Sequence, residues 1–171
     1  MATNETNMNV AGKNLTFKLN GEEYGLPIAA VQEIIRWQEI TRVPRVPNFI
    51  LGVLNLRGRV VPVLDLRRRF GLPPAPPQSR TCIIILQSAH ETGQILTGIV
   101  ADEVTEVVEI LPEQVGAPPE LGSRVDITFV GGVGQLGARV ILLLRVDKIL
   151  DSNEWFVVEQ MTQTEKENSY A

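Results

Sequence analysis

The chain has 171 residues, of which 44% are hydrophobic, and it carries 16 basic against 20 acidic side chains, a formal charge of −4. This length and composition are typical of one globular domain, or of two small ones that share a core. The acidic balance and an aromatic content of 5% argue against a nucleic-acid-binding protein, which usually presents a net basic face and aromatic platforms for bases.

The polar N-terminus is predicted to be disordered over residues 1–13, because it cannot bury enough apolar surface to offset the entropy of ordering. It lacks the basic start and apolar core of a signal peptide. No apolar run reaches the ~20 residues of a membrane-spanning helix, and the single cysteine excludes an internal disulfide. These features predict a cytoplasmic protein that does not insert into a membrane.

The stretch LTFKLNGEEYGLPI predicts a β-hairpin, with a turn at Asn20 and Gly21 between two alternating segments. Pro27 suits the first turn of a helix, where a missing N–H costs nothing. The next apolar residues recur at helical spacing and predict one short helix that ends near Arg36; they are Ile28, Val31, Ile34 and Ile35.

The stretch GVLNLRGRVVPVLDL predicts two strands that turn near Gly58. Pro62 restricts the second of them to a sheet edge or a bulge. RTCIIILQ predicts a buried strand. ILTGIVADEVTEVVEIL fits both helical and strand periods, and its valines and isoleucines favour a long, bent strand.

The C-terminal part predicts a hairpin over ITFVGGVGQLGARVILLLRV, followed over residues 151–171 by a short helix and a loose tail. Asp151 and Glu154 have the spacing of a capping box at the start of that helix. Nine or ten short strands with two short helices predict a mainly β protein built from small barrels.

The residues that usually carry catalysis are sparse. Gly132, Gly134 and Gly137 match the dinucleotide-binding pattern, but a predicted strand follows them instead of the helix that would hold the pyrophosphate. The only histidine, His90, lies in a polar loop, and Cys82 lies in an apolar run where thiols are inert. We therefore expect no enzyme activity, no cofactor and no metal.

Two groups of arginines stand out. Arg67, Arg68 and Arg69 follow a strand and are expected to be solvated. Arg57 lies in a hairpin, where a guanidinium can pair with a carboxylate and still offer a planar donor fork to a partner. Spacing alone leaves a structural and a functional role for Arg57 equally open.

The stretch GVLNLRGRVVPVLDLRRRFG resembles the signature of the CheW family, the coupling proteins of bacterial and archaeal chemotaxis. FKLNGEEYGLPIAAVQEI, RVPRVPNFILG, GIVADEVTEVVEI, APPE and FVGGVGQLGARVILLLRVDKIL are similar to further family segments, so the resemblance extends from Leu15 to Leu150. Ala101 and Arg145 depart from it, standing where valine and an acidic or amide residue are usual.

The resemblance implies two SH3-like five-stranded β-barrels packed together within residues 14–150. It also implies a non-catalytic adaptor that bridges the cytoplasmic tips of chemoreceptors, the methyl-accepting chemotaxis proteins, to the regulatory domain of the histidine kinase CheA. Such a protein is cytoplasmic and is recruited to receptor clusters at the membrane. Association with other copies of the chain in arrays stays open.

The resemblance further implies two binding surfaces. The kinase-binding residues are Val31, Glu33, Gly52, Asn55, Leu56, Arg57 and Gly58. A side chain at Gly52 would intrude on a docked partner, and we expect Glu33 and Arg57 to form an ion pair that positions the interface loop. The receptor-binding residues, in a groove between the barrels, are Ile28, Ile35 and Val100, for which ordinary core packing is an equal alternative.

Three other functions stay open at this point. The first is a coupling protein of a related chemosensory pathway that controls pili or gene expression. The second is an oligonucleotide-binding barrel that uses the arginine cluster and would bind single strands with a steep salt dependence. The third is an enzyme that uses the glycine-rich loop.

Overall fold

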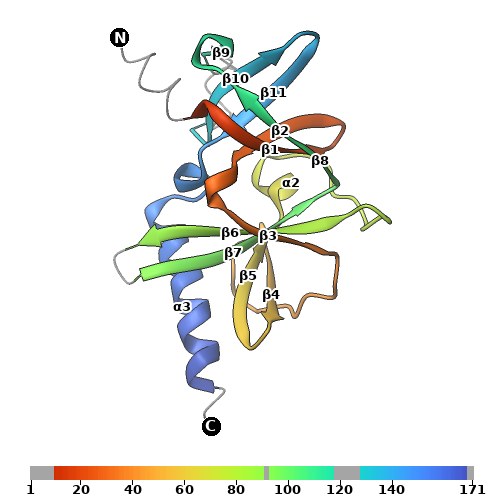
Figure 1. Ribbon diagram of the computed structural model, residues 1–171. Coiled ribbons are helices and arrows are strands. Elements are labelled where there is room, and N and C mark those ends of the chain that lie inside the picture. Colours follow the sequence, from red (N-terminus) through yellow and green to blue (C-terminus); the bar gives the residue numbers. More distant parts are fainter. Residues whose placement is uncertain (1–9, 91–92, 118–127, 169–171) are drawn as a thin grey trace. The chain divides into compact units, whose positions relative to one another are not determined.

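The computed structural model describes residues 10–90, 93–117 and 128–168, and the chain divides into two compact units (Figure 1). Unit 1 comprises residues 1–31 and 103–149, and unit 2 comprises residues 32–102 and 150–171. The two units are therefore interleaved along the sequence, because the chain leaves unit 1 after its first hairpin and returns to it later.

Unit 1 is built on a six-stranded sheet in the order β8-β1-β2-β11-β10-β9. Neighbouring strands are antiparallel, except that β11 and β2 are parallel. Its strands are β1 (Gly12–Leu19), β2 (Glu22–Pro27), β8 (Glu103–Ile110), β9 (Val115–Gly116), β10 (Val130–Leu136) and β11 (Arg139–Leu144). Short 3-10 helices cover Ile28–Ala30, Pro112–Gln114 and Val146–Lys148.

Unit 2 is built on a five-stranded sheet in the order β3-β6-β7-β5-β4. Its strands are β3 (Val31–Arg36), β4 (Ile50–Leu56), β5 (Arg59–Leu64), β6 (Cys82–His90) and β7 (Gly93–Ala101), and its helices are α2 (Leu66–Arg69) and α3 (Ser152–Asn168). Helix α3 lies against β5. A cluster of buried apolar side chains forms the core of the sheet: Leu54, Leu56, Val61, Val63, Ile83, Ile85 and Leu96.

The mainly β fold and the predicted hairpins are confirmed. Turns of two residues with positive φ at both positions join β1 to β2 at Asn20 and Gly21, and β4 to β5 at Arg57 and Gly58. Such turns match the right-handed twist of the flanking strands. The prediction of two five-stranded barrels needs correction, since one sheet has six strands and neither sheet is closed.

The predicted helix from Ile28 to Arg36 is wrong. Only Ile28–Ala30 form a 3-10 turn, and Val31–Arg36 form strand β3. Alternate residues of β3 are half-buried and exposed, and Ile34, which the helical stripe would have buried, is 44% exposed. β-branched side chains fit a pleated strand better than a helix, and pairing with β6 favours the strand.

The predicted long strand over residues 95–111 is two strands in two different sheets. Strand β7 ends at Ala101, Asp102 is a bend, and β8 begins at Glu103. Strand β7 pairs with β6 and β5, whereas β8 pairs with β1. Asp102 is therefore the residue at which the chain passes from unit 2 to unit 1.

Pro62 lies in an interior strand, not at the predicted edge or bulge. Strand β5 has β4 on one side and β7 on the other. Pro62 faces Val53, whose backbone N–H and C=O both bond to Thr41 instead. This pair therefore requires no donor from Pro62, whose nitrogen is directed toward β7 instead. The register of β5 with β7 begins at Val63, beyond that nitrogen, so the strand accommodates a proline.

The chain termini differ in part from prediction. Residues 1–9 and 169–171 lie outside the described residues, as do residues 118–127 with most of the APPE segment. Val10 is buried, and Gly12 and Lys13 belong to β1, although all three lie in the segment predicted to be disordered. Helix α3 has 17 residues, longer than expected.

The predicted capping box is present at the start of α3. The Asp151 carboxylate accepts a hydrogen bond from the Glu154 N–H at 2.8 Å, and the Glu154 carboxylate accepts one from the Asp151 N–H at 2.8 Å.

Among the described residues, no helix combines the length and the apolar character that crossing a bilayer requires.

Candidate functional site

The turn between β4 and β5 presents the centre of the signature motif. Arg57 and Gly58 occupy the two turn positions with φ of 50° and 86°. The Asn55 side-chain oxygen accepts a hydrogen bond from the Gly58 N–H at 2.7 Å. Two left-handed residues and this side-chain bond fix the turn in one conformation, which holds Arg57 at its tip.

Glu33 and Arg57 form the expected ion pair. The Arg57 guanidinium donates a hydrogen bond to the carboxylate of Glu33, which is the third residue of β3. The Arg57 side chain is 70% exposed and that of Glu33 is 25% exposed. The pair thus orients the arginine while most of its surface stays in contact with solvent.

Two further predicted kinase-binding residues, Leu56 and Val31, are less accessible. Leu56 is 7% exposed and belongs to the core of unit 2. Val31 is half-buried and lies on the same face of β3 as Glu33. We call the accessible residues of the motif, Glu33, Asn55, Arg57 and Gly58, the hairpin-tip surface.

Gly52 has a different role from the one expected. It is buried, its φ is +150°, and a Cβ atom on it would stand 2.8 Å from the Thr41 carbonyl carbon and 3.0 Å from the Arg42 Cα. The obstacle to a side chain is therefore the chain's own backbone. The expectation that Gly52 leaves room for a docked partner is not what the structure shows.

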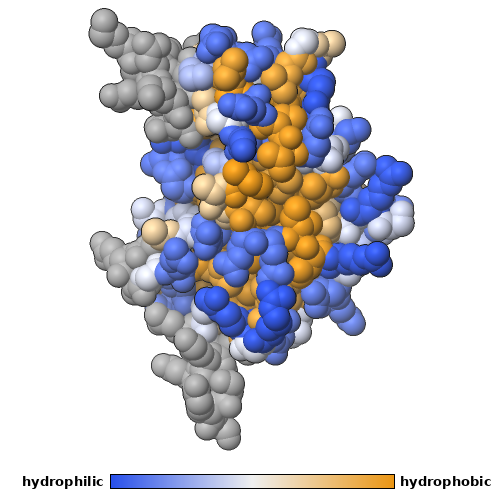
Figure 2. Space-filling view, in the orientation of Figure 1, coloured by the Kyte–Doolittle hydropathy of each residue, from blue (hydrophilic) through white to orange (hydrophobic). Residues whose placement is uncertain are grey.

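The predicted receptor-binding residues are divided between the units. Ile28 lies in the 3-10 turn of unit 1 and is 38% exposed. Ile35 and Val100 are half-buried and pack against the core of unit 2. In Figure 2, apolar residues reach the surface among hydrophilic ones. The exposed large apolar residues of the described chain are Ile28, Ile34, Val107, Leu111, Val140 and Phe156.

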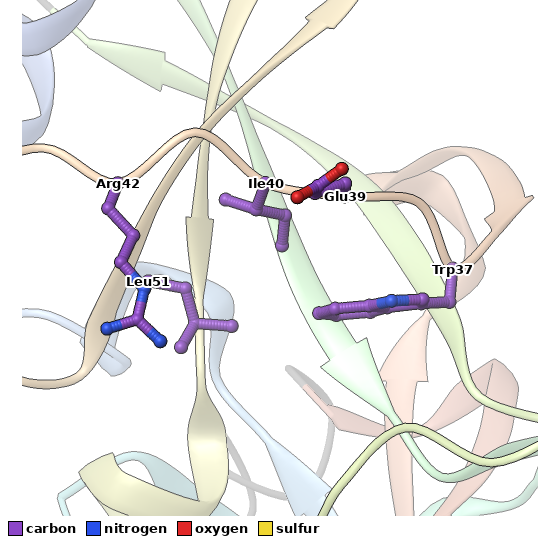
Figure 3. A pocket seen from close by; sticks show the side chains of 5 residues that line it. All are labelled: Trp37, Glu39, Ile40, Arg42 and Leu51. Carbon is purple, nitrogen blue, oxygen red and sulfur yellow. The ribbon is translucent and has the colours of Figure 1, made fainter.

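A pocket that the sequence analysis missed lies beside β4 (Figure 3). Its volume is about 430 Å³, and it is lined by Trp37, Glu39, Ile40, Arg42 and Leu51. The pairing of β4 with β5 shifts register between Ile50 and Gly52, so Leu51 is the extra residue of a bulge. Such a bulge arises from pairing between distant segments and leaves no local signal in the sequence.

The arginine run after β5 is less solvated than expected. Arg67 is only 12% exposed, and its Nε and second terminal nitrogen donate to the two Asp102 oxygens at 3.3 and 2.6 Å. The Arg69 guanidinium lies 5.6 Å from the centre of the Phe49 ring. Arg68 alone of the three matches the expectation, with 41% of its side chain exposed.

The glycine-rich segment has a packing role in unit 1. Gly132 and Gly134 lie within β10, and Gly137 begins the turn to β11. A Cβ on Gly134 would stand 3.0 Å from the Ile110 side chain, and one on Gly132 would stand 2.7 Å from that of Val115.

Within the described ranges, no three His, Cys, Asp or Glu residues are grouped so as to hold a metal ion. The side chain of His90 lies outside the described residues.

Comparison with known sequences shows close relatives over most of the chain. The model of the CheW-like domain matches residues 13–154. Chemotaxis protein CheW of Klebsiella aerogenes is 37% identical over 150 residues, covering 88% of each chain. Chemotaxis protein CheW of Bacillus subtilis is 39% identical, covering 81% of this chain and 86% of its own.

The fold is also similar to that of a solved structure. The crystal structure of the scaffolding protein TtCheW from Thermoanaerobacter tengcongensis aligns with a TM-score of 0.74 at 31% identity, covering 84% of this chain and 90% of that one. The hairpin-tip surface lies inside the matched range. By its family model, its relatives and its fold, the chain belongs to the CheW-like family.

Proposed function

We propose that this chain is a non-catalytic coupling protein of a chemotaxis pathway, which joins the cytoplasmic tip of a chemoreceptor to the regulatory domain of a CheA-type histidine kinase. Its family supports this, since the relatives described above are named chemotaxis proteins and TtCheW is named a scaffolding protein. The protein would act in the cytoplasm, at receptor clusters.

The kinase would bind the hairpin-tip surface. The observation that carries this assignment is the ion pair between Glu33 and Arg57, which joins the motif turn to β3. A guanidinium has five N–H donors, so it can hold one carboxylate and still donate to a partner. Because the turn is already fixed by Asn55 and Gly58, binding would cost little ordering entropy.

The receptor would contact the exposed apolar side chain of Ile28, the most accessible of the three predicted receptor-binding residues. Ile35 and Val100 are half-buried and would contribute less. Ile28 and Glu33 are five positions apart, joined by the 3-10 turn and the start of β3. A shift of this short connection could bias both contacts, and coupling free energies between sites are typically ~1–3 kcal/mol.

A charge-swap cycle tests the kinase surface. The regulatory domain of the kinase is captured on immobilised wild type, Glu33→Arg, Arg57→Glu and the double variant. Each single reversal places two like charges together and should reduce capture at least about tenfold, as expected for a close charge pair at an interface. The double swap restores the pair and should regain most of the lost capture.

Arg59→Glu is the matched control, since Arg59 is exposed beside the turn and lies outside the ion pair. It makes the same charge change as Arg57→Glu and should alter capture less than about threefold. Equal losses for Arg57→Glu and Arg59→Glu, or a double swap as weak as the singles, would contradict the assignment of this surface.

The pathway served by the chain is a separate question. A relative of 33% identity, Protein FrzA of Myxococcus xanthus, covers 80% of this chain. A chemosensory pathway for pili or gene expression would use the same hairpin-tip surface. The genes next to this one would distinguish the two, because a chemotaxis role expects a CheA-type kinase and a receptor among them.

A further inference from the structure

The two edge strands of the sheet in unit 2, β3 and β4, are connected by residues 37–49, part of which makes no backbone pairing. After β3, the Trp37 N–H donates to the Thr81 carbonyl at 3.2 Å, and Thr41 then exchanges two hydrogen bonds with Val53 in β4. Between these contacts, the backbone groups of residues 38–40 have no hydrogen-bond partner within the described part of the chain. We call residues 38–40 the edge gap.

The pocket described above opens beside the edge gap. Glu39 and Ile40 belong to both, and Trp37 and Arg42 flank the gap in sequence. In Figure 3 the Trp37 ring lies on one side, and Leu51 and the Arg42 guanidinium on the other. A volume of about 430 Å³ lies in the range of ligand-binding pockets, which are mostly apolar with a few polar groups at the rim.

The charge around the edge gap is positive although the whole chain is acidic. Residues 36–45 contain three arginines and one glutamate, a formal charge of +2. None of Arg36, Arg42 and Arg45 has an ion-pair partner among the residues that the structure describes. Exposed arginines without an internal partner are available to carboxylates of another molecule.

We propose that the edge gap and its pocket bind an extended acidic segment of a partner protein. The segment would pair with the free peptide groups of residues 38–40 as an added strand and place one apolar side chain between Trp37 and Leu51. Carboxylates beside that side chain would meet Arg42. Strand addition combines backbone hydrogen bonds for affinity with side-chain pockets for specificity.

Two features favour a peptide over a free small molecule. The unpaired peptide groups of residues 38–40 are consecutive and lie in the irregular segment after β3, where another backbone can bond to them. The gap spans three residues, about 10 Å at the rise of a β-strand, which suits three paired residues within a peptide of about five. Within the pocket lining the cation is Arg42 and the carboxylate is Glu39, whereas Arg36 and Arg45 lie outside it. The proposal deepens the scaffold function and rests on it for the partner's identity, but not for the binding chemistry.

A peptide titration tests the proposal without kinase or receptor, so its failure is distinguishable from failure of the proposed function. The probe is the peptide acetyl-Glu-Phe-Glu-Leu-Glu-amide, added to ¹⁵N-labelled full-length chain while the backbone amide resonances are recorded. We expect saturable shifts centred on residues 38–40. The same peptide with lysine in place of glutamate should bind at least about tenfold more weakly, because it meets arginines.

Two matched charge reversals complete the test. Arg42→Glu removes the cation that lines the pocket and should weaken the glutamate peptide about fivefold or more. Arg45→Glu makes the same charge change outside the pocket and should weaken it less than twofold. Ile40→Ala, which leaves every charge in place, should also weaken binding. An amide spectrum of each variant with wild-type dispersion establishes that it is folded.

Several outcomes would overturn the proposal. Shifts centred on the hairpin-tip surface or on unit 1 would place the peptide elsewhere. Equal affinity for the lysine peptide would remove the argument from charge. Equal losses for Arg42→Glu and Arg45→Glu would mean that the peptide is held only by general electrostatic attraction. If the amides of residues 38–40 showed no saturable shift, strand addition at the edge gap would be excluded.

Discussion

The backbone of Thr41 fills the space in which a side chain on Gly52 would lie. A Cβ on Gly52 would stand 2.8 Å from the Thr41 carbonyl carbon, and Thr41 is held there by two hydrogen bonds to Val53. The glycine therefore lets the segment after β3 run close against β4. The close contact between Thr41 and β4 positions the edge gap and the pocket beside that strand.

Replacing Gly52 by alanine should destabilise the protein strongly. The φ of +150° costs a side chain about 1–3 kcal/mol, and displacing the Thr41 backbone adds about 1–3 kcal/mol, so we expect a loss of roughly 2–6 kcal/mol in urea unfolding. Gly58→Ala is the control: its φ is +86° but nothing lies within 4 Å, so it should cost only about 1–2 kcal/mol.

If both variants lost the same stability, the Thr41 contact would not be the constraint. The result also bears on binding studies. A Gly52→Asp variant that fails to capture a kinase would fail through its distorted Thr41 segment, so it says little about where the kinase binds. The charge variants at the hairpin-tip surface avoid this problem.

Reversing either charge of the Glu33–Arg57 pair should change stability little. Arg57 is 70% exposed, and exposed ion pairs contribute about 0–1 kcal/mol. We expect Arg57→Glu and Glu33→Arg each to lower the free energy of unfolding by less than about 1 kcal/mol, measured in urea at low salt. A loss of several kcal/mol would mean that the pair holds the sheet together, and the capture experiment would then need a milder variant such as Arg57→Gln.

Local chemistry predicted the hairpins, because turn residues lie in short stretches, whereas the ion pair of Glu33 and Arg57 was expected from the family resemblance. Asn20 with Gly21 and Asp151 with Glu154 behave as their spacing predicts. The helix predicted from Ile28 to Arg36 failed for a physical reason. Its apolar residues fit two periods, and only pairing with β6, a segment some 50 residues away in the sequence, decides between them.

The edge gap and the pocket could not be predicted from the sequence. They depend on the bridge from Thr41 to Val53 and on the bulge at Leu51, both of which are set by strand register. Arg67 shows the same limit. It stands in a run of three arginines that look alike, and only the return of the chain at Asp102 separates it from Arg68.

Removing the Arg67 guanidinium should cost more stability than removing that of Arg68. Arg67 is 12% exposed, is bidentate to Asp102, and also donates to the Pro73 carbonyl at 2.8 Å. Losing charge-assisted bonds at a half-buried site costs roughly 2–3 kcal/mol. The Arg68 side chain is 41% exposed, and its pair with Asp65 and its bond to the Asn48 carbonyl at 3.1 Å lie near solvent, so Arg68→Ala should cost about 1 kcal/mol or less.

A double-mutant cycle isolates the pair itself. Arg67→Ala, Asp102→Ala and the double variant should show a coupling energy of about 1–2 kcal/mol, measured by chemical unfolding. Additive effects of the two changes would mean that Arg67 acts only through packing and its bond to Pro73.

Tyr24 should titrate well above its usual range. Burial in unit 1, the nearby charge of Glu22 and the hydrogen bond that the phenol donates to the Glu22 carboxylate at 3.4 Å together raise the pKa of Tyr24 from 10.0 to about 12. Each of these favours the neutral phenol over the phenolate. Absorbance near 295 nm should therefore show one tyrosinate transition centred near pH 12, and Tyr24→Phe should abolish that transition.

This shift makes part of the stability depend on alkaline pH. Since the folded pKa of Tyr24 lies above the unfolded value, the folded state holds its proton more tightly, and unfolding between pH 10 and 12 releases protons. The stabilisation is complete below pH 10 and is lost as the pH rises toward 12. Urea unfolding of wild type should weaken over that interval more steeply than that of Tyr24→Phe. Parallel pH profiles for the two proteins would show that the phenol titrates alike in both states.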